Sequence, residues 1–315
     1  MEYKTLNNGV KMPVVGLGTF QIPNERMTEV IGEAYELGYR MFDTALKYKN
    51  ESAIRAALKN NGINREEVFI STKCNADSLY WRGCHVGRRG WLDVRNCTSV
   101  RQTILKSFDN LGTDYIDLFL VHWPWPIPIA QKLYQELTKL YQENRIRAIG
   151  VCSSLPPHLD AFHDVSEVIP AVNQFEVSPL NTQKKLIDYC QKREICVEAM
   201  STFSHFRNTE TRKDITDNSI IAPIAEKHGK SIPQVILRWL VQQGIVVIPK
   251  SANKNRLKEN ISLFDFCLSE EEMSIIDALD QGHFLNYKPD LTLTKPYWIR
   301  GRVPQKYRGW NGFEI

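Results

Sequence analysis

The sequence of 315 residues has no apolar run long enough to cross a membrane, which argues against a helical membrane protein. Its start, Met1-Glu-Tyr-Lys-Thr5, lacks the basic segment and apolar core of a secretory signal, so we expect a cytoplasmic protein. The formal net charge of +4 is small for this length. We therefore expect neither a nucleic-acid nor a membrane partner, although local basic patches could still hold anionic ligands.

Two kinds of short motif are missing as well. The seven cysteines include no Cys-x-x-Cys pair, and the spacing of Cys84, His85 and Cys97 fits no zinc pattern, so we expect reduced thiols and no metal. No Gly-x-Gly-x-x-Gly turn is present, which argues against a Rossmann dinucleotide site. The phosphates of a nucleotide would have to be held by side chains and loop amides.

What the sequence does contain is a regular alternation of strand-like and helix-like segments. Apolar runs predict strands at 14–19, 40–43, 68–73, 118–121, 148–151, 171–174, 196–200 and 246–248. Helical periodicity predicts helices at 27–37, 51–60, 100–111, 130–143, 183–192, 219–228, 233–243 and 255–261. Eight strands that alternate with helix-like segments predict an α/β fold of the (β/α)8 TIM barrel type.

Four further features surround this predicted barrel. Asn8-Gly9 suits the type I′ turn of an N-terminal hairpin, and a long irregular loop at 75–99 follows the third strand. An extra helix is expected at 269–279, where Ser269-x-x-Glu272 is a capping pattern, followed by an irregular tail at 283–315. With no internal repeat or linker, we expect a single domain over residues 1–315.

Polar residues follow or end five of the predicted strands. The run Leu118-Phe-Leu-Val121 is followed by His122, and the other four end on Asp43, Lys73, Gln174 and Lys250. A lone histidine in such a place more often only caps a core strand. A parallel barrel, however, gathers the carboxyl ends of its strands around one opening, where barrels of this kind carry their chemistry. The repetition therefore predicts a site at that opening.

Four residues near this opening suit proton transfer to a carbonyl. A phenol titrates near pH 10, and the ammonium of Lys73 would stabilise the phenolate of Tyr48 and lower that pKa. Asp43 would keep Lys73 charged and in place. His122 could donate a hydrogen bond that orients a carbonyl oxygen beside the Tyr48 hydroxyl. The arrangement predicts proton donation to a developing alkoxide.

The sequence resembles the aldo-keto reductase family over nearly its whole length. The motifs that carry this resemblance are Gly16-Leu-Gly-Thr19, Phe42-Asp-Thr-Ala45 with Tyr48 and Asn50-Glu51, Ser71-Thr-Lys73, Val121-His-Trp-Pro124, Ala148-Ile-Gly-Val151, Pro170-Ala-Val-Asn-Gln174 and Ile248-Pro-Lys-Ser251. The resemblance implies that Asp43, Tyr48, Lys73 and His122 form a catalytic tetrad and that NADPH supplies the hydride.

A phosphate site is predicted where the last strand meets its helix. Lys250-Ser251 and Arg256 put two cations beside a helix N-terminus, which suits a phosphate monoester. The resemblance implies that Lys250, Ser251 and Arg256 hold the 2′-phosphate of NADP while Glu259 and Asn260 meet the adenine. The alternative is a solvated helix face on which Lys254 and Lys258 are ordinary surface charges.

The resemblance also implies a set of cofactor contacts along the barrel opening, namely Gly18, Thr19, Asp43, Cys152, Ser153, Gln174, Met200 and Ser201. Two of these places depart from the family. Gly150-Val-Cys152-Ser153 stands where the family usually has Gly-Val-Ser-Asn, and Met200 replaces an aromatic residue that stacks on the nicotinamide. Methionine covers a ring less rigidly. We expect weaker or differently posed nicotinamide binding, with catalysis retained.

The substrate site is implied by the resemblance to include Phe20, Tyr48, His122 and Trp123 around an apolar mouth. The loop at 75–99 would rise over the same opening, and it contains Arg82, Arg88, Arg89 and Arg95. It is either a solvated surface or a lid that recognises an anionic substrate. We expect an NADPH-dependent reductase of an aldehyde, ketone or imine; the alternative is an NADPH-binding sensor or regulatory barrel with little turnover.

Overall fold

The computed structural model describes residues 2–75, 85–86, 92–93, 100–124, 127–203 and 209–284. Most of the loop predicted at 75–99, with its four arginines, lies outside these residues, as does nearly all of the tail predicted at 283–315. Cys84 and Cys97 are outside them too. The loop is not irregular throughout, because His85–Val86 (β6) pairs antiparallel with Leu92–Asp93 (β7).

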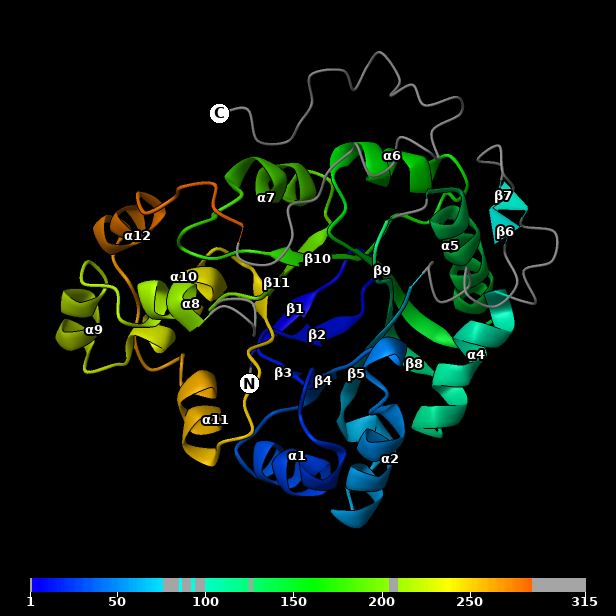
Figure 1. Ribbon diagram of the computed structural model, residues 1–315, viewed down its shortest axis with the longest axis horizontal. Helices are drawn as coiled ribbons and strands as arrows, with labels where there is room; N and C mark the ends of the chain where they lie inside the picture. Colours follow the sequence, from blue (N-terminus) through cyan, green and yellow to red (C-terminus); the bar gives the residue numbers. More distant parts are fainter. Residues whose placement is uncertain are drawn as a thin grey trace.

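Eight parallel strands form the centre of the described chain, with helices around them (Figure 1). In order around the sheet the strands are β3 (Leu17–Gly18), β4 (Met41–Asp43), β5 (Phe69–Cys74), β8 (Ile116–Val121), β9 (Ile146–Cys152), β10 (Val172–Glu176), β11 (Cys196–Met200) and β12 (Val246–Val247). The last strand returns to the first: Gly16 N donates to Val247 O at 2.8 Å, and Val247 N donates to Val14 O at 3.0 Å. These bonds close the ring, and the predicted (β/α)8 fold is confirmed.

The helices pack their apolar faces on the outside of the strands. In α5, Leu133, Leu137 and Leu140 recur at helical spacing and are fully buried. The helices are α1 (Met27–Glu36), α2 (Glu51–Asn60), α4 (Val100–Leu111), α5 (Ile127–Gln142), α6 (Pro156–His163), α7 (Lys184–Gln191), α8 (Thr209–Thr216), α9 (Ala222–His228), α10 (Ile232–Gln242), α11 (Lys254–Ile261) and α12 (Glu270–Asp277). None of the helices in these described ranges is both long and apolar enough to cross a membrane.

Two of these helices, α6 and α8, were not predicted. The Pro156-Pro157 pair argued against a helix in the sequence. Proline is nevertheless well suited to the first turn of a helix, as in α6, because the backbone N–H groups of that turn have no partner within the helix. The sequence of α8 has a single apolar residue, Ile215, so it shows no periodic apolar stripe. The extra helix α12 is confirmed with its capping box, in which Ser269 and Glu272 bond each other's backbone N–H at 3.2 and 2.7 Å.

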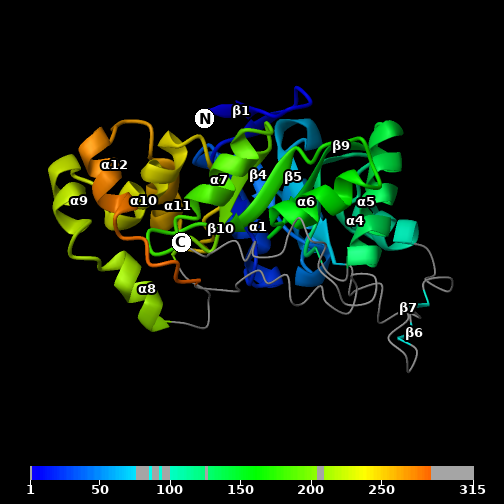
Figure 2. The ribbon, with the colours of Figure 1, turned by 90° about the horizontal axis from the view of Figure 1, so that it is seen from above.

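The N-terminal hairpin consists of β1 (Tyr3–Thr5) and β2 (Lys11–Pro13), and it lies at one end of the barrel, with α8 toward the other (Figure 2). Leu6 and Met12 are buried in the core inside the barrel, so the hairpin closes this end. Its turn is not type I′. Gly9 has a φ of +85° but Asn8 does not have a positive φ, and a type I′ turn needs positive φ at both residues.

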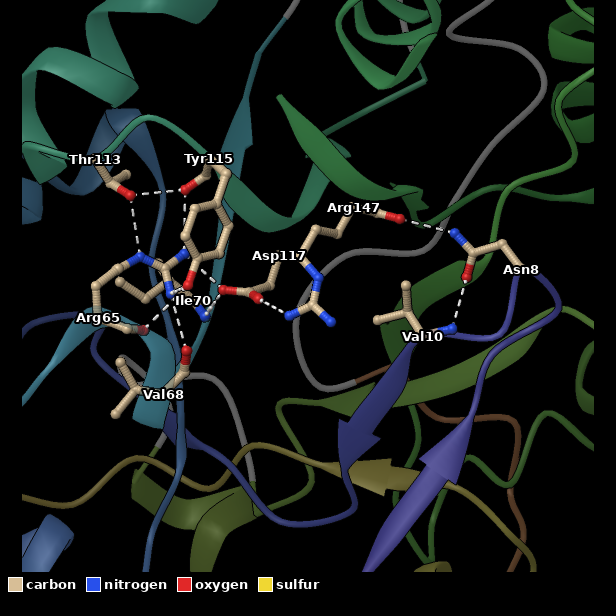
Figure 3. A network of polar contacts seen from close by, with 9 residues as sticks. All are labelled: Asn8, Val10, Arg65, Val68, Ile70, Thr113, Tyr115, Asp117 and Arg147. Carbon is tan, nitrogen blue, oxygen red and sulfur yellow. Dashed lines mark hydrogen bonds and ion pairs between the residues drawn. The ribbon is translucent and has the colours of Figure 1, made fainter. Parts of the chain in front are cut away.

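A buried carboxylate, Asp117, ties the strands together near this closed end (Figure 3). Its Oδ2 accepts from Arg65 Nη2 at 2.6 Å and from Ile70 N at 2.9 Å, and its Oδ1 accepts from Arg147 Nη1 at 2.7 Å. The carbonyl of Arg147 accepts from Asn8 Nδ2 at 2.8 Å, which connects the hairpin to the same network. Asp117 is the second residue of β8, the strand that His122 follows, so this structural network lies at the end away from the predicted site.

Strand alternation decides which side chains face the interior of the barrel. Phe69 belongs to the core inside the ring, whereas Ile70 packs in the core under the helices. Because side chains alternate along a strand, Lys73 faces the same interior as Phe69. The same alternation directs further polar side chains into the barrel interior. Each of them lies two or four positions after a residue of the interior core: Asp43, His122, Cys152, Gln174 and Glu198.

Candidate active site

A buried ion pair between Lys73 and Asp43 lies at the centre of the predicted site. Lys73 Nζ is 2.6 Å from both carboxylate oxygens of Asp43 and donates to Thr44 O at 2.9 Å. Lys73 is fully buried and Asp43 is 2% exposed. Burial is the largest single effect and lowers the pKa of Lys73, but the charge and hydrogen bond of Asp43, added to the effects of Tyr48 and Cys152, together outweigh it and the pKa is raised. Lys73 is therefore an ammonium at neutral pH.

Tyr48 stands on a 3₁₀ turn (Leu46–Tyr48) beside this pair. Its ring centroid is 5.4 Å from Lys73 Nζ and 4.7 Å from that of Phe20. Burial raises the pKa of Tyr48, Lys73 lowers it, and the result is about 12. Lys73 acts in the expected direction, but the expectation of a phenol pKa below its ordinary value is wrong, because burial is the larger effect. Tyr48 keeps its proton at neutral pH.

His122 faces Tyr48 from the end of β8. The two rings are 5.8 Å apart in an edge-to-face arrangement, and Trp123 stacks near-parallel to His122 at 5.8 Å. Burial, together with the positive charges of Lys73 and Lys47, holds the pKa of His122 well below its ordinary value. The neutral ring carries one N–H for donation. The structure thus brings together the four residues predicted for proton transfer.

Two predicted cofactor residues, Gly18 and Thr19, fix the geometry behind Asp43. Thr19 Oγ1 donates to Asp43 O at 2.8 Å, and Asn50 Nδ2 donates to Thr19 O at 3.0 Å. A Cβ on Gly18 would lie 2.7 Å from the carbonyl oxygen of Ile248, so this position needs glycine for the close approach of two backbones. These contacts hold the ends of β3, β4 and β12 together.

Cys152, Ser153 and Gln174 lie on neighbouring strands behind the tetrad. Gln174 is in register with Cys152, and its Oε1 is 3.8 Å from Cys152 Sγ. Its Nε2 donates to Asp43 Oδ2 at 3.3 Å, so Gln174 contacts the tetrad directly. Ser153 donates its backbone N–H to Gln174 O at 2.8 Å and has a φ of +46°, a left-handed conformation that serine rarely adopts.

Glu198 was not predicted as a site residue. It is fully buried on β11, in register with Gln174, whose Nε2 donates to Glu198 Oε2 at 2.5 Å. Burial and the charge of Asp43 raise the pKa of Glu198 to about 8. The sequence held a signal, since Cys196-Val-Glu-Ala-Met200 has one acidic residue within an otherwise apolar strand. Met200 follows on the same side and is partly exposed, and Ser201 after it has a φ of +56°.

The predicted phosphate site lies where β12 leads into α11. Lys250 is exposed, Ser251 is 6% exposed, and Asn253 caps α11 by accepting from Arg256 N at 3.1 Å. Partial burial of its ammonium and the nearby cation Arg212 of α8 lower the pKa of Lys250. A cation that is destabilised by a second cation favours an anionic ligand.

Other residues of α11 divide between surface and interior. The predicted adenine contacts differ in burial, with Glu259 exposed and Asn260 6% exposed. Lys254 Nζ lies 3.7 Å from Glu33 Oε1 and 3.9 Å from Glu36 Oε2. Lys254 is therefore an ordinary surface charge, as the alternative of a solvated helix face predicted. The helix therefore offers Arg256, rather than Lys254, as a cation for a phosphate.

The chain is similar to known proteins over most of its length. The family model described as "Aldo/keto reductase family" matches residues 14–281. Glyoxal reductase of Bacillus subtilis is 39% identical over 286 residues, which cover 90% of this chain and 95% of that protein. Methylglyoxal reductase DkgA of Escherichia coli K12 is 37% identical over 286 residues, covering 90% of this chain and 96% of that protein.

Two solved structures are similar over most of their length. An aldo-keto reductase, MGS-M4, from a deep-sea metagenome library has a TM-score of 0.78 at 34% identity and covers 91% of this chain and 98% of its own. A mutant of Gox0644 in complex with NADPH has a TM-score of 0.76 at 31% identity, covering 89% and 94%. On the family match, the identities and the shared barrel, the chain belongs to the aldo/keto reductase family.

Proposed function

We propose that this protein is an NADPH-dependent reductase of small carbonyl compounds in which Tyr48 donates the proton. The observation that carries the proposal is the arrangement of Tyr48 next to a buried, charged Lys73 and a neutral His122. Such a site offers an acid, a positive charge and a hydrogen-bond donor around one point at the barrel opening.

The residues at the opening fit NADPH. In the described part of the chain neither Lys250 nor Arg256 forms an ion pair with a carboxylate, and Arg212 adds a third positive charge near Lys250. Lys250, Ser251 and Arg256 would hold the 2′-phosphate and Glu259 with Asn260 the adenine. Along the opening, the set that would contact the rest of the cofactor is Gly18, Thr19, Asp43, Cys152, Ser153, Gln174, Met200 and Ser201. When bound, NADPH supplies a hydride to the carbonyl carbon.

The side chains of the site orient the carbonyl and protonate its oxygen. His122 donates its N–H to the carbonyl oxygen and places that oxygen beside the Tyr48 hydroxyl. Tyr48 transfers its proton to the same oxygen as negative charge develops there. The ammonium of Lys73 stabilises the phenolate that remains, and Asp43 holds that ammonium at 2.6 Å. Because the pKa of Tyr48 is about 12, nearly every molecule holds the required proton at neutral pH.

Apolar side chains at the opening and the names of two similar proteins support a small carbonyl substrate. Phe20, which is 40% exposed, and Trp123 provide apolar surface next to Tyr48 and His122. Two similar proteins named glyoxal reductase and methylglyoxal reductase support small dicarbonyls as substrates. We further propose that the substrate is a carbonyl compound or cyclic imine with an anionic group. This part rests on the four arginines in the sequence of the 75–99 loop.

The experiment that tests this function is NADPH consumption against a panel of glyoxal, methylglyoxal, simple aldehydes, ketones, keto acids and cyclic imines. We expect turnover of at least one small carbonyl compound, and preference for a keto acid over a neutral ketone of equal size would support the anionic substrate. NADPH binding without turnover of any compound would favour the sensor or regulatory protein. Failure to bind NADPH would overturn the proposal.

A further inference from the structure

The interior of the barrel contains an acidic side chain that the proposed reaction does not use. Glu198 is fully buried, and its Oε1 has no hydrogen-bond partner among the described residues. A buried carboxylate with an unpaired oxygen is costly, so such a group tends to keep its proton. Glu198 therefore supplies a neutral acid directly behind the tetrad.

The amide of Gln174 links this acid to the tetrad. Its Nε2 carries two hydrogens and lies 2.5 Å from Glu198 Oε2 and 3.3 Å from Asp43 Oδ2. Its other end, Oε1, faces the thiol of Cys152 at 3.8 Å. Glu198 and Asp43 together fix which end of the amide points toward the tetrad. Loss of either acceptor would free the amide to turn over.

The charges around Glu198 come from the neighbouring strands. Asp43 on β4 and Lys73 on β5 are the charged groups, while Cys152 on β9 and Cys196 on its own strand are thiols whose pKa burial raises. From β12 the residue in register is the apolar Val246. With Glu198 neutral, Lys73 faces one carboxylate. With Glu198 ionised, two carboxylates would share one ammonium.

We propose that Glu198 is a positioning residue that acts through Gln174 and Asp43, and that its proton controls how well Lys73 supports Tyr48. While Glu198 is protonated, the positive charge of Lys73 is available to the phenolate that Tyr48 forms. Once Glu198 ionises, the second negative charge opposes that phenolate and slows proton donation. This effect on rate rests on the proposed function, whereas the ionisation of Glu198 does not.

The pH dependence of kcat/KM for carbonyl reduction tests the effect on rate. Because the pKa of Glu198 is about 8, wild-type activity should fall as the pH rises through that value, to a level on the order of tenfold lower, the effect of one charge roughly 10 Å away at an effective dielectric constant of about 20. Glu198→Gln keeps the size and an oxygen that accepts from Gln174, but it cannot ionise, so this step should be absent.

A matched control is Glu51→Gln. Glu51 is also a buried glutamate whose pKa burial raises, but it bonds Thr72 at 2.7 Å and Asn110 at 2.9 Å on the helix side of the sheet. This variant should keep the wild-type step near pH 8. A step that persists in Glu198→Gln, or disappears in both variants, would overturn the proposal.

An infrared titration tests the ionisation without turnover. The C=O stretch of a protonated carboxyl should be present in the wild type at neutral pH and disappear as the pH rises through about 8. It should be missing from the difference spectrum of Glu198→Gln. A wild-type spectrum with no carboxyl band that disappears near pH 8 would overturn the inference, because Glu198 would then not titrate there. A protein that reduces no carbonyl but shows this titration would refute only the proposed function.

Discussion

Lys73 Nζ lies 2.6 Å from each carboxylate oxygen of Asp43, at the ends of two adjacent parallel strands. Both side chains face the barrel interior and are almost completely buried. A buried ion pair of this kind is weak evidence for stability, but the loss of one partner leaves a charge without compensation. Removing either Asp43 or Lys73 should therefore lower the stability of the barrel and change the charge beside Tyr48.

The first prediction concerns this pair. Asp43→Asn should lower the free energy of unfolding by about 3–5 kcal/mol, because it leaves a buried ammonium without its carboxylate. The double variant Asp43→Asn with Lys73→Met removes both charges and should lose less than the sum of the two single variants. Urea unfolding of the four proteins measures this. Strictly additive losses would show that the two residues do not depend on each other.

The second prediction concerns the choice of cofactor. Arg256→Ala should weaken NADPH binding by about 1.5–3 kcal/mol, the scale for a hydrogen bond to a charged group, with little effect on NADH. Lys254→Ala is the matched control, because Lys254 is on the same helix but lies near Glu33 and Glu36. Titration by fluorescence quenching suffices. Equal losses for NADPH and NADH would refute a 2′-phosphate contact at Arg256.

The third prediction concerns the backbone at Ser153, which has a φ of +46°. Asparagine is several-fold more frequent than most residues in this left-handed region, so Ser153→Asn should raise the free energy of unfolding by about 0.5–1 kcal/mol. The variant also supplies the side chain that the family usually has here. We therefore expect NADPH to bind more tightly. A less stable variant in urea unfolding would contradict the argument from strain.

The fourth prediction concerns acid stability. Burial acts to raise the pKa of Glu272, but hydrogen bonds from Lys227, the Ser269 backbone and His228 outweigh it and lower the pKa to about 2. A depressed carboxyl pKa stabilises the fold above its ordinary value of 4.5, and this contribution is lost as the pH falls from about 4.5 to 2. Glu272→Gln should be less stable than the wild type at pH 6 and equally stable near pH 2. A constant difference across this range would contradict the assignment.

Much of the barrel and of the tetrad could be predicted from sequence because both depend on local patterns. Apolar runs with polar ends specified the strands, and strand alternation then placed Lys73 and His122 at one opening. The pKa of Tyr48 could not be predicted, because it depends on how deeply the tertiary structure buries the phenol. Glu198 was missed although it interrupts an apolar strand, because its partner Gln174 is on another strand and the sequence alone does not pair them. The turn at Asn8-Gly9 shows that a dipeptide does not determine a turn type alone.

The most direct test of the central claim is a single-turnover measurement on Tyr48→Phe. This change removes one hydroxyl and keeps the ring that packs 4.7 Å from Phe20. With any carbonyl compound that the wild type reduces, we expect unchanged NADPH affinity and a chemical step slower by about two to four powers of ten, the scale of general acid catalysis. A Tyr48→Phe variant that folds, binds NADPH and reduces the carbonyl as fast as the wild type would show that Tyr48 is not the proton donor.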